Sequence, residues 1–423
     1  MSLDIRKILG KHSTRVIRNT FFLTSSEIAI KIVGFLWVIF LARQLSLEHY
    51  GRYTLVNAFV ALFAILPDLG VGLIAIREIA KDKKRSTLIL SNTFFINAML
   101  GIATFTGLLI LSKILNYPKD IQVLVIIAGL SLLLSSLRSS VVIYFEAHEK
   151  MLYTAILNAF NTIVMITGGL IAFLVFDSLV SIFQGMLIGI TISFFVSWFV
   201  LSKHIILRLH IDKNIVKKLL LAGLPLGLAA LSYMIYTRID SIILHKLLGE
   251  QAVGQYNAAT PFVFALIQLL NVPFAVAIYP ALSEAYREDR KRFVRGIKKS
   301  LLYVASWSFP LAFIISFLAP VIMPLVFGMK YASATPILQA LIYFVPFASL
   351  SALLYKMLII TNRQNLYFFI SLVGVGLNLI LNLIFIPRYL VIGAAYASVA
   401  TQFILVIIYG IVVVKTLRVY KKI

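Results

Sequence analysis

The sequence predicts an all-α integral membrane protein, with twelve transmembrane helices arranged as two lobes of six helices. Three observations lead to this fold class. Hydrophobic residues make up 61% of the 423 residues and charged residues only 13%, with a mean hydropathy of +0.98, far outside the range of soluble domains. The apolar residues gather in long runs, and the basic residues fall mostly between alternate runs.

Twelve apolar runs are long enough to cross a bilayer, which takes ~20 mostly apolar residues as a helix. Lipid cannot pair with backbone polar groups, so these runs must be helices or strands of a closed barrel, and they are too long and continuous for strands. The predicted helices are 20–42, 53–76, 88–111, 121–145, 153–176, 179–201, 219–246, 255–279, 297–318, 335–360, 365–386 and 393–414.

The first six runs form the predicted N-terminal lobe, residues 1–210. Residues 1–18 are polar and basic, so we expect the first run to serve as its own insertion signal without a cleavable leader. The second run contains LPDLG, in which Pro67 and Gly70 weaken the helix. Residues 202–218 alternate apolar and basic residues, as expected of a segment on the membrane surface between the lobes.

The last six runs form the predicted C-terminal lobe, residues 211–423, because a short motif repeats between the halves. LSLEHYGRYTLVNAF at residues 45–59 aligns with LGEQAVGQYNAATPF at residues 248–262, so that Gly51 matches Gly254 and Tyr53 matches Tyr256. A shift of six spans preserves orientation, which predicts parallel lobes related by a pseudo-twofold axis along the membrane normal. Several prolines in these runs predict bent helices.

The net charge of +23 follows the predicted topology rather than indicating nucleic acid as a partner. With a cytoplasmic N-terminus, 28 of the 39 Lys and Arg residues fall in cytoplasmic segments and seven on the other side. This asymmetry follows the positive-inside rule and predicts a multi-pass protein of the cytoplasmic (inner) membrane with both termini in the cytoplasm. The chain has no cysteine, which excludes disulfides and thiolate metal sites.

Several stretches resemble the Wzx-type flippases, a family within the multidrug/oligosaccharidyl-lipid/polysaccharide (MOP) exporter superfamily, whose fold is MATE-like. They are LARQLSLEHYGRYTLVNAF, LPDLGVGLIAIREIA, RIDSIILHKLLGEQAVGQYNAATPF, IYPALSEAY and GLNLILNLIFIPRYLVIGAAYASVAT. The resemblance implies alternating-access transport of a polyprenyl-phosphate-type lipid-linked oligosaccharide for polysaccharide or glycoconjugate export. Lipid II flippases usually carry two additional C-terminal helices, and their absence here favours the twelve-helix Wzx type.

Charged residues inside the runs are the main candidates for a site, because a charge at mid-bilayer costs ~3 kcal/mol even on mild scales. Glu27 and Lys31 have the i, i+4 spacing of an ion pair, which leaves a structural pair and a role in substrate or ion binding both open. Asp68 is either a capping residue at the LPDLG kink or an ion-coupling group. Arg138, within SSLRSSVV, is a candidate phosphate ligand or a salt-bridge partner.

Arg238 and Asp240 lie two positions apart, roughly 200° around a helix, so they cannot pair with each other. Arg238 is a candidate ligand for a phosphate head group, with an interhelical salt bridge as the alternative. Asp240 shares its face with Tyr233 and Tyr236, which offer hydroxyls rather than a fixed cation. We therefore predict Asp240, ahead of Glu27, as the group that couples transport to H⁺ or Na⁺. Lys356 is close enough to a span end to reach the interface.

Uncharged polar residues extend the predicted substrate surface, since amides match sugar hydroxyls and aromatic rings stack on sugar rings. Hydrogen bonding between helices is the alternative for each of them, and we favour it for Asn378 and Asn382. The predicted sugar contacts are Tyr53, Asn57, Tyr236, Asn257, Gln268 and Asn271.

Other classes of function fit the sequence less well. No nucleotide-binding loop, HExxH motif or nucleophile elbow is present, so we predict a transporter rather than an enzyme. A membrane glycosyltransferase or polymerase would need larger outer loops with carboxylates. The main alternative is a cation-coupled multidrug exporter of the same superfamily. We predict no cofactor beyond a coupling ion and no bound metal, and as partners a lipid-linked oligosaccharide and membrane lipid, with the chain monomeric near glycan-assembly enzymes.

Overall fold

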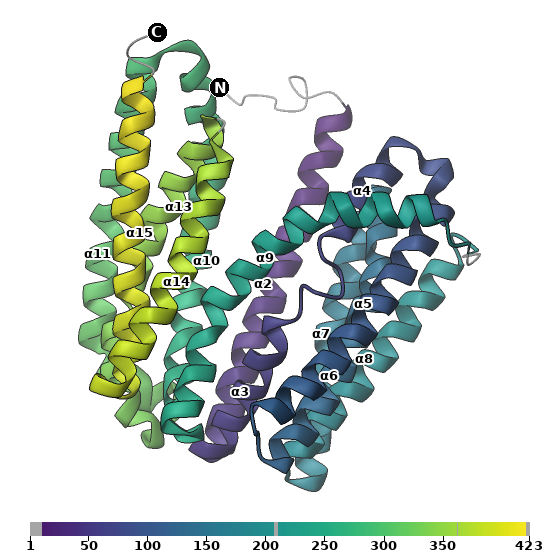
Figure 1. Cartoon of the computed structure of the whole chain (residues 1–423), viewed down its shortest axis with the longest axis horizontal. Helices are drawn as coiled ribbons and strands as arrows, with labels where there is room; N and C mark the ends of the chain where they lie inside the picture. The colour runs from purple at the N-terminus through teal and green to yellow at the C-terminus, as the bar shows by residue number, and fades with distance from the viewer. Residues whose placement is uncertain (1–10, 207–209, 362, 420–423) are drawn as a thin grey trace, which may run out of the picture. The chain divides into compact units, whose positions relative to one another are not determined.

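The computed structural model describes residues 11–206, 210–361 and 363–419, and every regular element within them is a helix (Figure 1). The long helices follow one another with short connections. Two short 3-10 helices, η1 and η2, join neighbours. The elements are α2 (Lys11–Gln44), α3 (Leu47–Leu62), α4 (Val71–Lys81), η1 (Lys83–Arg85), α5 (Ser86–Ile114), α6 (Lys119–Ala147), α7 (Met151–Phe176), α8 (Leu179–Ser202), α9 (Lys213–Leu248), α10 (Glu250–Glu288), α11 (Arg290–Phe327), η2 (Met329–Ala334), α12 (Thr335–Leu341), α13 (Phe344–Ile360), α14 (Gln364–Tyr389) and α15 (Val391–Val419).

Each of the twelve predicted runs falls on one helix or on two consecutive helices. The second run divides into α3 and α4, and the tenth into α12 and α13. Among the described residues, nine helical segments are long and apolar enough to cross a membrane by length and composition. The all-helical membrane fold is therefore confirmed, while the count of twelve spans stays a prediction.

The break between α3 and α4 lies at the LPDLG motif. Leu69 and Gly70 adopt φ values of 45° and 78°, in the left-handed region where glycine is the least strained residue. The Asp68 carboxylate accepts hydrogen bonds from the backbone N–H groups of Gly70 (3.0 Å) and Gly72 (2.9 Å), the first donors of the next helix. A proline, a glycine and a capping carboxylate thus end one helix and start another within the span.

The helices form two compact units, whose division does not follow the chain order of two lobes. Unit 1 contains Met1–Phe40 and Phe59–Leu231, and unit 2 contains Leu41–Ala58 and Ser232–Ile423. The first half of α9 therefore packs with unit 1 and its second half with unit 2. The division into lobes 1–210 and 211–423, which the repeat suggests, therefore stays a proposal. Residues 41–58 pack in unit 2, and the first half of α9 packs in unit 1.

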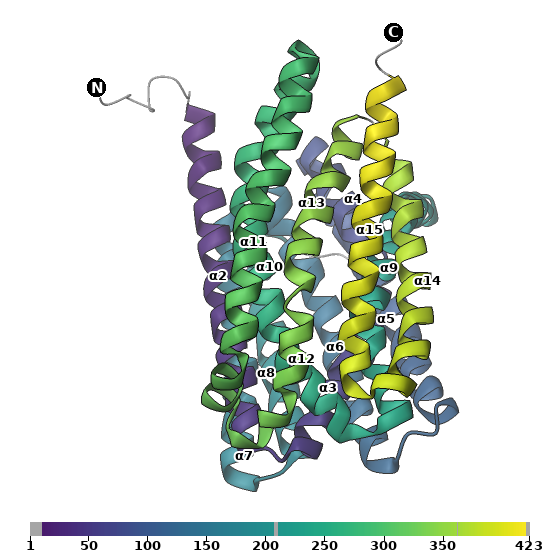
Figure 2. The same ribbon diagram turned by 90° about the vertical axis from the view of Figure 1, so that its left-hand side faces the viewer.

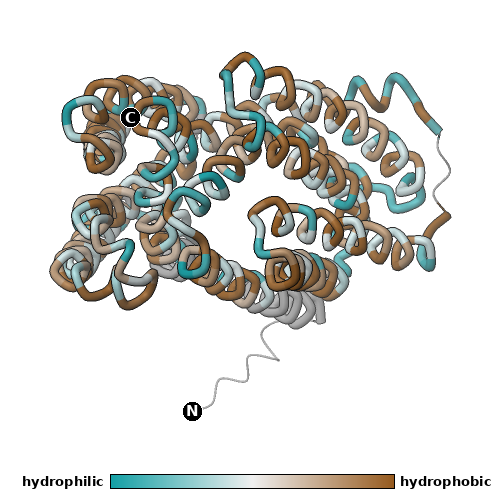
Figure 3. Tube along the Cα trace, turned by 90° about the horizontal axis from the view of Figure 1, so that it is seen from below, coloured by the Kyte–Doolittle hydropathy of each residue, from teal (hydrophilic) through white to brown (hydrophobic). Residues whose placement is uncertain are grey.

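Hydrophobic side chains cover the outside of the helices as well as their interior, and brown dominates the helical trace in Figure 3. Phe176 at the end of α7 is 71% exposed and Phe317 on α11 is 76% exposed. A soluble protein rarely exposes contiguous apolar surface on this scale. These exposed aromatic residues are what helices in contact with lipid require.

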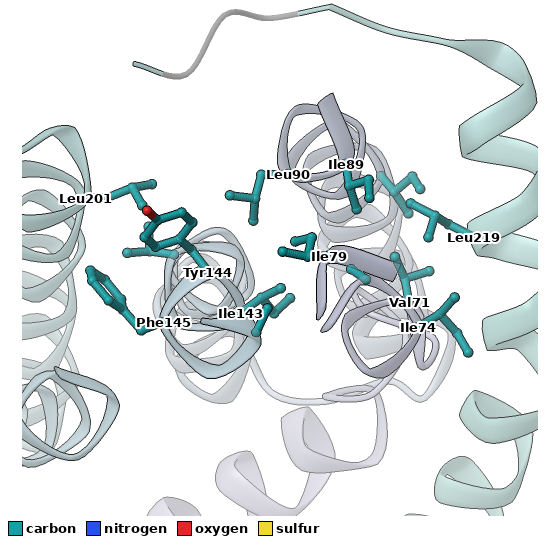
Figure 4. Close-up of a cluster of buried hydrophobic side chains, with 14 of the residues drawn as sticks. Val71, Ile74, Ile79, Ile89, Leu90, Ile143, Tyr144, Phe145, Leu201 and Leu219 are labelled. Carbon is teal, nitrogen blue, oxygen red and sulfur yellow. The ribbon is translucent and has the colours of Figure 1, made fainter. Parts of the chain in front are cut away.

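The core of unit 1 lies where α4, α5 and α6 meet the first half of α9. Val71, Ile79, Ile143 and Leu219 are buried there, and Figure 4 shows them converging from these helices. At the edge of the same unit, the Glu78 carboxylate on α4 accepts hydrogen bonds from Lys81 (2.9 Å) and from Lys218 on α9. Apolar packing and this ion cluster together hold the beginning of α9 against α4.

Unit 2 has its own core, formed by α10, α11, α13, α14 and α15. Leu282 and Phe293 from α10 and α11 pack with Leu358 on α13 and Tyr409 on α15. In Figure 2, α10 and α11 run side by side up to the joint between them. The core of unit 2, which includes Leu282 and Phe293, therefore extends to the end of the pair where α10 joins α11.

The segment Leu41–Ala58, here called the strap, packs on unit 2 through close backbone contacts. A Cβ atom added at Gly51 would lie 1.9 Å from the Glu250 carbonyl oxygen, and one added at Gly254 would lie 2.5 Å from that of Leu47. Gly51 and Gly254 are the positions that the repeat aligned, and the same offset relates Leu47 to Glu250. The contact is therefore reciprocal, as a twofold relation between α3 and α10 requires.

Polar contacts reinforce the strap. Arg52 forms ion pairs with Glu250 (3.0 Å) and Glu48 (2.7 Å). Arg43 donates to the Val326 carbonyl at the end of α11 (2.8 Å), while Lys330 donates to the Arg43 carbonyl at the end of α2 (2.8 Å). Arg43 thus satisfies a carbonyl group at the C-terminus of α11 and Lys330, on η2, one at the C-terminus of α2, where positive charge is most favourable.

Candidate functional site

Asp240 occupies a polar pocket inside unit 2, in the second half of α9. The residue is only 5% exposed. Its Oδ2 accepts hydrogen bonds from the Tyr256 hydroxyl on α10 (2.8 Å) and the Ser398 hydroxyl on α15 (2.8 Å). Its Oδ1 accepts one from the Asn382 amide on α14 (2.7 Å). Four helices therefore meet at one carboxylate.

All three groups that donate to Asp240 are neutral. Within the part of the chain that the structure describes, no cation forms a salt bridge with this carboxylate. Burying an ionised carboxylate is costly, and hydrogen bonds from neutral donors offset only part of that cost. The arrangement leaves the proton affinity of Asp240 dependent on what else enters the pocket.

Asparagine and serine side chains form a second layer around Asp240. The Asn382 amide also donates to the Asn378 side-chain oxygen (3.1 Å), while the Asn257 amide donates to the Ser241 hydroxyl (3.0 Å). In this arrangement the Asn382 side-chain oxygen is buried and has no hydrogen-bond partner among the described residues. The carboxylate is therefore surrounded by additional oxygen atoms, the ligands that hard cations such as Na⁺ prefer.

The pocket beside Asp240 is small. Its walls come from α9, α10, α13, α15 and the end of α12, and its volume is about 30 Å³. That volume holds one or two water molecules or a small cation. Tyr236 forms part of the wall, with its ring stacked on Phe344 at 6.5 Å between centroids. The chemistry of this pocket therefore suits a proton or a monovalent cation.

Arg238 lines the same pocket from a different face of α9, as the helical spacing predicted. Unlike Asp240, its side chain is exposed. No hydrogen bond or salt bridge from its guanidinium is formed within the described residues, so the alternative of an interhelical salt bridge is not what this structure contains. Its donors are free to bind an anion.

Three of the remaining predicted residues of unit 2, Tyr53, Asn57 and Gln268, do not line this pocket. Tyr53 is buried in the strap, and the nearby Asn57 amide donates to the Tyr53 carbonyl (2.8 Å) while its side chain stays exposed. Gln268 is exposed further along α10. Asn271 belongs to a stretch of α10 whose side chains lie outside the described part of the structure.

Arg138 lies in unit 1 and is buried between α6 and α7. Its Nη2 donates to the Asn158 side-chain oxygen (2.9 Å) and its Nη1 to the Leu157 carbonyl (3.4 Å), whereas Nε has no partner among the described residues. No carboxylate pairs with it in the described ranges. The buried charge is thus held by neutral acceptors alone, and the salt-bridge alternative is absent from this conformation.

Three predicted carboxylate and lysine positions in unit 1 have other surroundings. Glu27 and Lys31 on α2 are both exposed, and the structure contains no ion pair between them. Asp68 caps α4, as the structural alternative required. Because its carboxylate is occupied by two backbone donors, the geometry favours the capping interpretation for Asp68.

The sequence does not predict the three residues that donate to Asp240. Tyr256 is visible only as part of the repeat, and no pattern distinguishes Ser398. Asn382 was assigned to helix packing, yet its amide donates directly to Asp240. The only available signal is a polar residue within an apolar run, which many helix contacts share. Nothing in the sequence relates Asn382 or Ser398, 142 and 158 positions further along the chain, to Asp240.

Comparison with known proteins places the chain in a family. The model of the family described as "Polysaccharide biosynthesis protein" matches residues 16–286, more than half of the chain. The MatE family model matches residues 225–384. The first match covers the strap and the second covers Asp240 and Asn382.

Curated relatives are about a quarter identical to the chain over the aligned residues. A putative O-antigen transporter of Shigella dysenteriae is 26% identical over 86% of this chain and 91% of its own length. The uncharacterized membrane protein MJ1068 of Methanocaldococcus jannaschii is 28% identical over 46% of this chain, and the capsular polysaccharide biosynthesis protein CapF of Staphylococcus aureus is 26% identical over 50%. Those two matches span 38% and 54% of the relatives' lengths.

Solved structures confirm the fold. The lipid II flippase MurJ in an inward closed conformation superposes with a TM-score of 0.75 at 18% identity, over 94% of this chain and 89% of that one. An inward-facing multidrug resistance MATE transporter of the MOP superfamily gives 0.74 at 15% identity, over 93% and 96%. With a family match over more than half of its length and a MATE-like fold, the chain belongs to the polysaccharide biosynthesis proteins of the Wzx-type flippase family.

Proposed function

We propose that this protein flips a polyprenyl-phosphate-type lipid-linked oligosaccharide across the cytoplasmic membrane by alternating access. Membership in the Wzx-type family supports the substrate class, and a relative described as a putative O-antigen transporter aligns over most of both chains. Arg238 is the single observation that carries the proposal at residue level. It is an exposed cation within an apolar span, without a salt bridge in the described residues.

A phosphate group is the anion that suits Arg238 best, because a planar guanidinium donates to phosphate oxygens in a fork. Arg138, Lys31, Tyr53, Asn57, Tyr236, Asn257, Gln268 and Asn271 remain proposed contacts for the rest of the substrate. The lipid tail would stay in the bilayer while the head group crosses.

We also propose that Asp240 is the coupling site, with H⁺ or Na⁺ as the ion. A coupling ion does work only if it binds one conformation better than another. The donors to Asp240 come from three other helices, so a relative shift of any of them changes the number of hydrogen bonds to the carboxylate. Glu27 is exposed and lacks such a network in the structure, which leaves it the weaker candidate.

The first test measures transport in liposomes. Purified protein should move a fluorescent lipid-linked pyrophosphoryl oligosaccharide between leaflets, followed by quenching of the fluorophore in the outer leaflet. Ethidium should neither compete nor be exported. Rapid ethidium export without lipid movement would contradict the proposal and favour the cation-coupled exporter, whose family model also matches the region around Asp240.

The second test imposes pH and Na⁺ gradients separately on the same liposomes. Flipping by the wild type should respond to one of them, and Asp240→Asn should remove that response while Glu27→Gln retains it. The asparagine keeps the shape of the side chain and can still accept hydrogen bonds, so the comparison isolates the charge. Gradient dependence that persists in Asp240→Asn would refute the assignment to this carboxylate.

A further inference from the structure

The first eleven residues of α11 form an amphipathic segment at the end of the α10–α11 pair (Figure 2). Phe293, Ile297 and Ser300 are buried against unit 2. The other side of the segment carries exposed cations, and no acidic residue occurs in its first turn. These cations, here called the basic face, are Lys291, Arg292, Arg295, Lys298 and Lys299.

The basic face continues into the lipid-facing side of the same helix. Residues three or four positions apart lie on one face, and the sequence Lys291, Arg295, Lys298, Leu302 follows that spacing. Leu302 is 71% exposed, and the exposed apolar side goes on toward the other end of α11. It consists of Tyr303, Phe313, Ile314, Phe317 and Val321. The exposed side of α11 thus passes from cations at its beginning to aromatic and aliphatic side chains further along.

This order matches the layers of a lipid monolayer. Cations lie where phosphate groups would be, Tyr303 follows at the depth where amphipathic aromatic rings concentrate, and apolar side chains lie where acyl chains would be. The helix is also fixed in position, because Phe293 and Ile297 belong to the core of unit 2 together with Leu282 and Leu358. The basic face is therefore a rigid surface rather than a mobile tail.

Only one of the five cations forms a salt bridge within the described residues. Arg292 pairs with Glu288 at 3.7 Å, and the described part of the chain contains no other salt bridge to the basic face. Like charges repel at i, i+4 spacing, which relates Lys291 to Arg295 and Arg295 to Lys299. Positive charge at the N-terminus of a helix also opposes the helix dipole. The one cap, Asp289, uses its carboxylate on the backbone N–H groups of Lys291 (2.7 Å) and Arg292 (3.1 Å). These repulsions lower the stability of the segment, and a bound anion would offset them.

We propose that the basic face of α11 binds the phosphate head groups of anionic bilayer phospholipids. The partner must combine an anionic head with apolar chains, because the cations and the exposed apolar residues share one face. An anionic phospholipid has this combination, whereas a soluble acidic protein would leave the apolar part of the face uncovered. The site belongs to unit 2 alone and does not depend on the transported substrate.

The test uses Trp307, which lies two turns beyond Lys299 on α11. The chain has three tryptophans, so Trp37→Phe and Trp198→Phe leave Trp307 as the only one. Fluorescence quenching by brominated phosphatidylglycerol, compared with brominated phosphatidylcholine, then reports which lipid occupies the neighbourhood of α11. We expect phosphatidylglycerol to be preferred about fivefold, the factor that one well-placed cation is worth near an anionic surface, and the preference to fall as salt rises.

A matched pair of variants separates this site from general basicity. The triple variant Lys291→Gln, Arg295→Gln, Lys298→Gln should reduce the preference to about onefold. The control removes three exposed cations elsewhere, Lys83→Gln, Lys84→Gln and Arg85→Gln in η1, and should keep the preference. Equal quenching by both lipids in the parent protein, or equal loss in both triple variants, would overturn the proposal. Normal quenching by brominated phosphatidylcholine in each variant verifies that α11 is inserted.

Discussion

At the residue scale, Arg238 and Asp240 acquire different surroundings although they are two positions apart on α9. Asp240 is enclosed by three neutral donors, whereas the guanidinium of Arg238 stays exposed at the same pocket. The helical geometry alone predicts this separation. It allows one short stretch of helix to offer a cation to substrate and a carboxylate to an ion.

Arg238→Ala should reduce flipping about tenfold or more, because losing one charged hydrogen bond costs about 1.5–3 kcal/mol. Thermal stability in detergent should not change, since Arg238 is exposed and has no salt bridge in the described residues. Arg238→Lys should recover part of the activity by restoring charge without the fork. Lys356→Ala serves as a control and should retain most flipping. Wild-type rates for Arg238→Ala in liposomes would exclude a head-group role.

Arg138 should behave in the opposite way toward stability. Its charge is buried with neutral acceptors and without a carboxylate in the described residues, so burial is only partly compensated. Replacing buried charges by apolar groups of similar size often stabilises a protein. Arg138→Met should therefore raise the melting temperature, by an amount equivalent to roughly 1 kcal/mol, while flipping falls. A variant that is both more stable and fully active would remove Arg138 from the substrate site.

At the scale of elements, the strap is held by two glycines that permit backbone contact. Gly254→Ala would place a Cβ atom 2.5 Å from the Leu47 carbonyl oxygen, so α3 and α10 must separate. We expect a loss of at least 1–3 kcal/mol, the usual cost of overpacking, and reduced flipping. The control is Gly107→Ala on α5, where a Cβ atom would meet nothing within 4 Å and alanine favours the helix. Equal melting temperatures for the two variants would show that the strap tolerates separation.

The ion cluster between α4 and α9 makes unit 1 sensitive to acid. Hydrogen bonds from Lys218 and Lys81 hold the pKa of Glu78 at about 2, below its ordinary value of 4.5. A lowered folded-state pKa stabilises the protein above pH 4.5, and the contribution disappears as pH falls toward 2. Because both lysines are largely exposed, the effect should be about 1 kcal/mol or less.

Thermal unfolding of Glu78→Gln beside the wild type checks this dependence. The melting temperature of the wild type should exceed that of the variant by a constant amount above about pH 5, and the two curves should converge on acidification. Glu284→Gln, which removes an exposed carboxylate away from this cluster, controls for net charge. A difference that is independent of pH between 5 and 3 would mean that the ion cluster does not support α9.

At the scale of the whole molecule, periodicity and composition predict the helices, but not how the packed units divide the chain. The apolar runs are set by the thickness of the bilayer, and each falls on the expected helix. The Gly51 and Gly254 match also identifies two positions that touch. The exchange of the strap and the first half of α9 depends on packing between distant segments, which no local pattern encodes.

The candidate site likewise contains residues that the sequence predicts and residues that it does not. A charge in an apolar run is visible in the sequence, so Arg238 and Asp240 could be predicted. Their partners could not, because Asn382 and Ser398 reach Asp240 only through tertiary packing. Spacing alone was also insufficient for Glu27 and Lys31. Their i, i+4 positions permit an ion pair, but exposed side chains gain little free energy from forming one.

The orientation of the whole chain in the membrane is a separate prediction, based on the 28 and seven basic residues on the two sides. The absence of native cysteines makes it directly measurable, because every introduced thiol is the only one. Lys84 and Glu288 both lie in predicted cytoplasmic segments. Single cysteines at these positions should therefore react with a membrane-impermeant maleimide only after the cytoplasmic side is opened. Cysteines at Lys119, where α6 begins, and at Gln251, near the beginning of α10, should react in intact cells. Translocating the basic segments would oppose the positive-inside bias, so we expect no mixture of the two orientations. Labelling of Lys84→Cys and Lys119→Cys from the same side would contradict a span at α5 and with it the twelve-helix topology.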